Sequence, residues 1–239
     1  MPMLGSNLHL RTSSVKRIKV VKYVRVQLRQ FYYEVSGATF TDTRLFQLAA
    51  MDFVDSSGAK IPYATTGVTM SAGGFSDAWL EAYSGGDPGR IANPNDNESA
   101  WRLFDGSDGT KFCHIGTNYG GSGSWNPGHS YSWGPGGWVQ WHADGDNGIP
   151  VERVSGIRMV HGNDTDSSSG SRAPVSWSIY VSENGVNWLM VDSQDMRTDL
   201  PMSGGREFYR TYVDMSVLPK LSEDDCGGPP QQSVSKPAA

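Results

Sequence analysis

Residues 15–28 read VKRIKVVKYVRVQL, a run in which apolar and polar or charged side chains largely alternate. Successive side chains of a β-strand point to opposite faces, so this period of two predicts a strand with one buried face. The basic side chains on its other face are part of a cluster of Lys and Arg residues that extends from Arg11 to Arg29. The sequence predicts that this basic face is half solvated, or alternatively that it meets an anionic surface or partner.

The rest of the chain favours the same class of structure. It holds 29 Gly and 13 Pro among 239 residues, a composition that suits short strands joined by tight turns. The pair Asn184-Gly185 is typical of a type I′ hairpin turn. Further strand candidates lie at 45–54, 100–115, 138–143, 154–160, 176–182, 188–193 and 208–215.

The pattern predicts one domain with polar ends. Residues 1–14 form an extension, 15–217 the β-domain, and 218–239 a tail with too little to bury, which we expect to be disordered. Cys113 falls in a strand candidate and is expected to be a small core residue. A disulfide between Cys113 and Cys226 in the tail is the open alternative.

Charge and hydropathy bear on partners and localisation. The formal net charge is −5, which argues against nucleic acid as a partner. The sequence contains no window of 18 apolar residues, so no membrane span is predicted. Residues 1–14 lack the apolar core of a signal peptide. We therefore expect neither a membrane span nor export through a signal peptide, and the localisation stays open between a virion surface and the cytoplasm.

Four fragments resemble the coagulation factor 5/8 type C, or discoidin, family and related galactose-binding-like carbohydrate-binding modules. The order LFDG…TKF at 103–112, WVQ at 138–140 and VSGIR at 154–158 is similar to three successive family motifs. The sequence PVSWSIYVSENGVNW at 174–188 is the most specific match. The resemblance covers residues 100–193.

A second block resembles the strands that close this family's fold, but here it comes first in the chain. YVR at 23–25 and LAAMDF at 48–53 carry it. The resemblance implies a circularly permuted, antiparallel jelly-roll-like β-sandwich of about eight strands, with ligands bound by loops at one end. Independently, Trp138, Trp177 and Trp188 lie in strand candidates and are expected to fill the space between two sheets as scaffold.

One turn carries the residues of a candidate structural calcium site. Asp105, Asp108 and Thr110 supply oxygen atoms on a tight Gly-containing turn. The resemblance implies calcium there, although Ala50 stands where the family often has a Glu ligand, and Asp52 is the candidate substitute. The alternative is a turn in which Asp105 caps backbone amides without an ion.

A Gly-rich loop at 116–137 is the first choice for a ligand site, because exposed aromatic rings stack on sugars while polar groups nearby bind hydroxyls. Glycan binding, protein contact and structural packing all remain open for this loop. The candidate ligand-binding residues are Tyr119, Trp125, His129, Tyr131 and Trp133, with His161, Asn163 and Asp164 from the loop at 161–172, which is expected to lie beside it.

The sequence predicts no enzyme. Its five histidines are scattered, and it has no nucleophile or metalloprotease motif. The favoured hypothesis is a non-catalytic recognition module that binds a glycan or glycoprotein, as a viral or phage surface component. The alternative is a structural subunit, inside a cell or a virion, that uses the same loops for contacts with other protein subunits.

Overall fold

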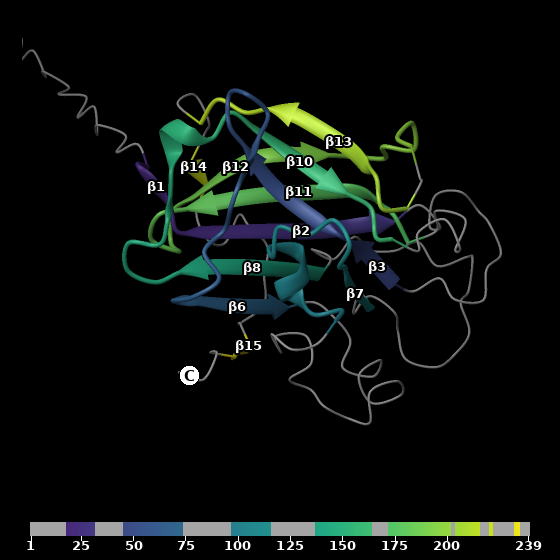
Figure 1. Ribbon diagram of the computed structural model, residues 1–239, viewed down its shortest axis with the longest axis horizontal. Helices are drawn as coiled ribbons and strands as arrows, with labels where there is room; N and C mark the ends of the chain where they lie inside the picture. The colour runs from purple at the N-terminus through teal and green to yellow at the C-terminus, as the bar shows by residue number, and fades with distance from the viewer. Residues whose placement is uncertain are drawn as a thin grey trace, which may run out of the picture.

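The computed structural model describes residues 18–31, 45–73, 97–115, 137–163, 172–201, 204–215, 220–221 and 232–234. These residues form antiparallel strands and short 3₁₀ helices (Figure 1). Within them, no helix is long and apolar enough to cross a membrane. The predicted all-β, antiparallel class is confirmed.

A seven-stranded sheet forms the larger layer, and every neighbouring pair in it is antiparallel. Its strands, in spatial order, are β14 (Lys220–Leu221), β12 (Trp188–Gln194), β11 (Pro174–Ser182), β2 (Tyr23–Phe31), β8 (Gly137–Ala143), β6 (Val68–Gly73) and β15 (Gln232–Val234).

A four-stranded sheet forms the smaller layer. Its order is β13 (Glu207–Tyr212), β10 (Gly156–Val160), β4 (Ala50–Val54) and β5 (Lys60–Ile61). Two separate pairs complete the strands: β3 (Leu45–Leu48) with β7 (Phe112–Ile115), and β1 (Val20–Val21) with β9 (Ile149–Pro150). The 3₁₀ helices are η2 (Ala100–Leu103) and η3 (Val151–Arg153), so the strand expected from residue 100 begins only at Phe112.

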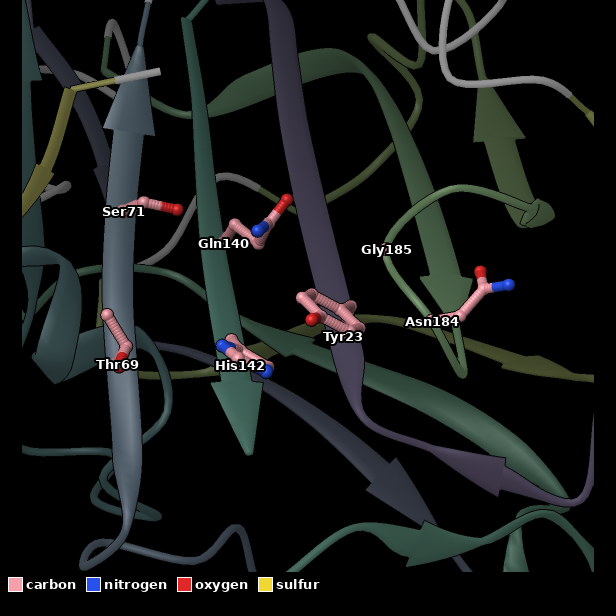
Figure 2. A pocket seen from close by; sticks show the side chains of 7 residues that line it. All are labelled: Tyr23, Thr69, Ser71, Gln140, His142, Asn184 and Gly185. Carbon is pink, nitrogen blue, oxygen red and sulfur yellow. The ribbon is translucent and has the colours of Figure 1, made fainter. Parts of the chain in front are cut away.

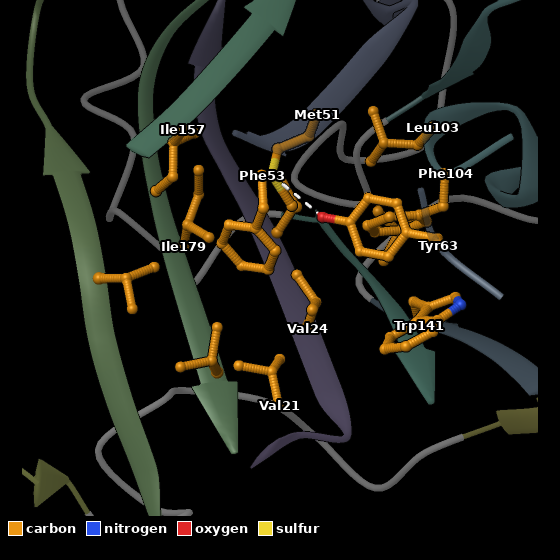
Figure 3. Close-up of a cluster of buried hydrophobic side chains, with 14 of the residues drawn as sticks. Val21, Val24, Met51, Phe53, Tyr63, Leu103, Phe104, Trp141, Ile157 and Ile179 are labelled. Atoms are coloured by element: carbon orange, nitrogen blue, oxygen red, sulfur yellow. Dashed lines mark hydrogen bonds between the residues drawn. The ribbon is translucent and has the colours of Figure 1, made fainter. Parts of the chain in front are cut away.

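The hydrophobic core joins the two larger sheets. Val24 and Trp141 of the seven-stranded sheet belong to the same buried cluster as Phe53 and Ile157 of the four-stranded sheet (Figure 3). Two antiparallel sheets that share one apolar interior form a sandwich-like arrangement. Burial of each such aliphatic or aromatic side chain contributes about 1.5–3 kcal/mol before the entropic cost of folding is counted.

The strand that contains Tyr23 lies in the middle of the seven-stranded sheet. β2 pairs with β11 on one side and with β8 on the other, and it does not form a separate N-terminal hairpin. The alternation in 15–28 explains this position, because Val24, Val26 and Leu28 are buried in the core while Tyr23 and Arg25 point to the opposite face.

The expectation for the tryptophans was wrong in part. Trp177 lies in the core between the sheets, as predicted, and Trp141 joins it there. Trp138 and Trp188 are buried on the other face of the seven-stranded sheet, where both flank Arg25. The register decides this placement: Val26 pairs with Val139, so Val139 turns inward and Trp138 outward.

The C-terminal tail differs from its expectation where it is described. Lys220–Leu221 and Gln232–Val234 form β14 and β15, which pair with the two edges of the seven-stranded sheet, at β12 and β6. Backbone pairing at an open sheet edge does not require apolar side chains, which explains how so polar a segment adds strands. Cys113 is buried, as expected of a small core residue, and Cys226 lies outside the described residues.

Candidate functional site

The outer face of the seven-stranded sheet carries polar and aromatic side chains in register. Tyr23 of β2 pairs with His142 of β8, and His142 pairs with Thr69 of β6. Two residues further along each strand, Arg25 pairs with Gln140, and Gln140 pairs with Ser71. Because directly opposed residues share a face of the sheet, each row brings side chains from three strands together.

A pocket of about 270 Å³ opens on this face (Figure 2). Figure 2 shows that its side chains come from β2, β6 and β8 and that the loop after β11 closes one side. The volume is slightly below the range of about 300–1,000 Å³ that is usual for ligand sites in proteins, which suits a small ligand of about one sugar ring. The lining residues are Tyr23, Thr69, Ser71, Gln140, His142, Asn184 and Gly185.

Two stacked rings form the aromatic part of the pocket. The rings of Tyr23 and His142 lie parallel, with centroids 4.1 Å apart and an interplanar angle of 7°. Burial lowers the pKa of His142, against the opposing effect of Asp144, so this ring is neutral at pH 7. Burial, and then the negative charge of Asp144, raise the pKa of Tyr23, which keeps its hydroxyl protonated.

A buried arginine supports the polar part of the pocket. Arg25 is 2% exposed, and its guanidinium carbon lies 4.6 Å from the ring centroid of Trp138 and 4.5 Å from that of Trp188. Its Nε donates a hydrogen bond to Oε1 of Gln140 at 3.0 Å. The interpretation of this basic face as half solvated is therefore wrong at Arg25, because cation–π contacts and a hydrogen bond compensate for its burial.

Several polar atoms of the pocket have no hydrogen-bond partner among the described residues. The hydroxyls of Tyr23, Thr69 and Ser71 and the side-chain nitrogen of Gln140 make no hydrogen bond in the part of the chain that the structure describes. Protein polar groups are normally paired with protein or solvent, so unpaired groups that converge on a concave surface are available to a ligand.

The loop between β11 and β12 closes the pocket with a geometry that the sequence did not predict. Gly185 has a φ of 72°, whereas Asn184 does not adopt a positive φ, so the turn is not type I′. Instead, Oδ1 of Asn184 accepts hydrogen bonds from the backbone amides of Val186 and Asn187. A Cβ atom at Gly185 would lie 3.0 Å from Cζ of Tyr23, so glycine permits the close approach of this loop to the ring.

Of the ligand residues expected from the sequence, the structure describes His161 and Asn163, and neither lines this pocket. His161 is fully buried, its ring is stacked on that of Phe208, and its Nε2 donates a hydrogen bond to the carbonyl oxygen of Pro201 at 2.8 Å. It is thus not exposed to a ligand, whereas Asn163 is exposed. Tyr119, Trp125, His129, Tyr131, Trp133 and Asp164 lie outside the described residues.

The four predicted calcium ligands divide into two groups. Oδ1 of Asp105 accepts hydrogen bonds from the backbone nitrogen of Ser107 at 2.9 Å and from the hydroxyl of Thr110 at 3.1 Å, which are the contacts of a capped turn. Asp52 and Asp108 instead meet at Arg158. Among the described residues, no group of three or more His, Cys, Asp or Glu side chains is arranged to hold a metal ion. These contacts give the four residues roles that need no ion and do not test the calcium site, so calcium and the capped turn both stay open.

Arg158 is the centre of a charge network on the four-stranded sheet. It contacts Asp52 at 2.6 Å, Glu207 at 2.9 Å and Asp108, which Lys60 also contacts at 2.8 Å. The hydrogen bond from Arg158 is the main cause that lowers the pKa of Asp108 to about 2. Asp52 is almost fully buried, and loss of water raises its pKa despite the arginine.

Comparison with protein-family models, with curated proteins and with solved structures found no match. The function of this protein is therefore inferred from the chemistry of the site. The sequence contained one signal for the pocket, because Tyr23, Thr69, Ser71 and Gln140 are the polar members of alternating strand patterns. What it lacked was the pairing of β2, β8 and β6, which brings these members together.

Proposed function

We propose that this protein is a non-catalytic recognition module that binds carbohydrate in the pocket on the outer face of its seven-stranded sheet. The observation that carries the proposal is the combination, in one concave site, of the stacked Tyr23 and His142 rings with unpaired hydroxyl and amide groups. Sugars present apolar C–H faces beside a dense rim of hydroxyls, so they need both kinds of surface at once.

The lining residues favour binding over hydrolysis. Glycoside hydrolysis commonly uses a pair of carboxylates that flank the scissile bond. The residues that line the pocket are aromatic, hydroxyl or amide residues and a glycine, and they include no Asp or Glu. A neutral hydrogen-bonding surface of this kind is suited to holding hydroxyl groups and not to protonating a glycosidic oxygen.

The discoidin-like, circularly permuted jelly roll belongs to the same proposal. The central position of β2, between β11 and β8, supports it, because a strand that closes the family's fold would keep its neighbours after permutation. The aromatic loop at 116–137 immediately precedes β8 in the chain, so we retain Trp125 and Trp133 as proposed additional sugar contacts.

A glycan array tests the proposal. We expect the full chain to bind a defined set of glycans and the variant Tyr23→Ala to lose that binding at the same concentration of folded protein. Loss of binding only in the double variant Trp125→Ala/Trp133→Ala would move the site to the loop. If the wild type bound no glycan on a broad array, the carbohydrate proposal would be overturned, and a protein-assembly subunit of a virion or a cell would be favoured.

A further inference from the structure

The amide of Gln140 has a fixed orientation. Arg25 has only hydrogen-bond donors, so the atom of Gln140 that receives its Nε–H at 3.0 Å must be the carbonyl oxygen. The two indole rings on either side of the guanidinium restrict its movement. The NH₂ group of Gln140 is therefore the part of the amide that remains available to a ligand in the pocket.

This NH₂ group is also a strengthened donor. A hydrogen bond from a cation to the carbonyl oxygen of an amide polarises the amide and makes its N–H bonds better donors. Ser71 lies opposite Gln140 in the sheet register and adds a hydroxyl on the neighbouring strand (Figure 2). The pocket thus offers the NH₂ group of Gln140, which can only donate a hydrogen bond, beside the hydroxyl of Ser71, which can also donate.

Such a pair favours a ligand oxygen that only accepts. A sugar hydroxyl is both donor and acceptor, so a fixed donor discriminates little between one hydroxyl and another. The carbonyl oxygen of an acetamido group accepts only, and the methyl group beside it needs an apolar surface, which the stacked Tyr23 and His142 rings provide. We propose that the pocket selects a neutral sugar that carries an acetamido group, an inference that rests on the proposed carbohydrate function.

An acidic sugar fits the pocket less well. No Lys or Arg side chain is among the lining residues, and Arg25 is already enclosed by Trp138 and Trp188. Oδ1 of Asp144 lies 3.8 Å from Nδ1 of His142, so negative charge is present at the edge of the site. A ligand carboxylate would lose water without gaining an ion pair from the lining.

Titration calorimetry with matched sugars tests the selectivity. We compare N-acetylglucosamine with glucose, N-acetylgalactosamine with galactose, and glucuronic acid with glucose, using the full chain. In the first two pairs the acetamido sugar should bind about fivefold more tightly than its parent hexose, the gain expected from one additional hydrogen bond, and glucuronic acid should bind no more tightly than glucose. In Gln140→Glu, which keeps the side-chain size but removes the donor, this ratio should fall to about one while the affinity for the parent hexose changes less.

Two further variants make the result decisive. Glu152→Gln makes the reverse exchange at an exposed position of η3 and should leave the ratio unchanged. If Gln140→Glu does not fold, as judged by circular dichroism, Ser71→Ala should lower the ratio instead. Equal affinity for each acetamido sugar and its parent hexose, or tighter binding of glucuronic acid than of glucose, would overturn the acetamido proposal and leave the carbohydrate function standing. Absence of binding to all the sugars would overturn both.

Discussion

Tyr23 and His142 face each other across neighbouring strands with their rings stacked 4.1 Å apart, although 118 positions separate them in the chain. This contact exists only because β2 pairs with β8. Since the same pairing sets Arg25 beside Gln140, one register determines both the aromatic and the amide part of the proposed sugar site.

Replacement of Tyr23 by Ala should weaken sugar binding about tenfold, because the ring contributes to the stacked aromatic surface of the pocket. Calorimetry with a glycan identified on the array measures the change. Tyr212→Ala is the matched control, since Tyr212 is 77% exposed on β13 of the other sheet. An affinity equal to that of the wild type would show that the rings do not contact the ligand.

Replacement of Arg25 by Lys should destabilise the protein by about 2 kcal/mol, although the charge is kept. Lysine cannot reproduce a planar guanidinium between two indole rings that also donates to Gln140. Urea unfolding measures the loss, with Arg153→Lys at an exposed position of η3 as the control. If both variants were equally stable, the stacked arrangement would contribute nothing to folding.

Replacement of Arg158 by Met should cost about 3 kcal/mol, because it leaves the carboxylate of Asp52 buried without its cation. The double variant Arg158→Met/Asp52→Leu should regain more than half of this loss, since both buried charges are then absent. Chemical denaturation of the two variants provides the comparison. A double variant no more stable than the single one would contradict this account of the network.

Acid should weaken the protein through Asp108. Its pKa in the folded state is lowered to about 2, below the value near 3.8 expected when unfolded, so its contribution to stability is present above about pH 4 and is lost as the pH falls toward 2. Asp108→Asn should be less stable at pH 7 by about 1 kcal/mol, because these ion pairs are partly exposed. Its stability should also fall less steeply between pH 4 and 2, and parallel curves for variant and wild type would contradict the prediction.

Chelation tests the calcium prediction. Arg158 already neutralises Asp52 and Asp108, and Asp105 is engaged by Ser107 and Thr110, so we expect EDTA to leave the melting temperature unchanged. A melting temperature that falls with EDTA and recovers with added Ca²⁺ would show instead that these residues hold a structural ion.

The sequence predicted the strands better than it predicted the site. The alternation at 15–28 was sufficient to place Val24 and Val26 in the core, because strand periodicity is a local property. Whether Trp138 turns inward or outward depends on its register against β2, which no local pattern contains. The contacts that join Asp52 to Arg158, and Tyr23 to His142, likewise connect distant segments, so only the folded arrangement reveals them.

Nuclear magnetic resonance of the side-chain amide of Gln140 shows most directly whether sugar binds in this pocket. In the full chain labelled with ¹⁵N, its two N–H signals are assigned by their absence from Gln140→Glu, and sugars are then added at millimolar concentration. These signals should shift in a saturable way, with the same dissociation constant that calorimetry gives. Sugar binding that leaves the Gln140 amide signals unchanged would place the site elsewhere on the protein and contradict the claim.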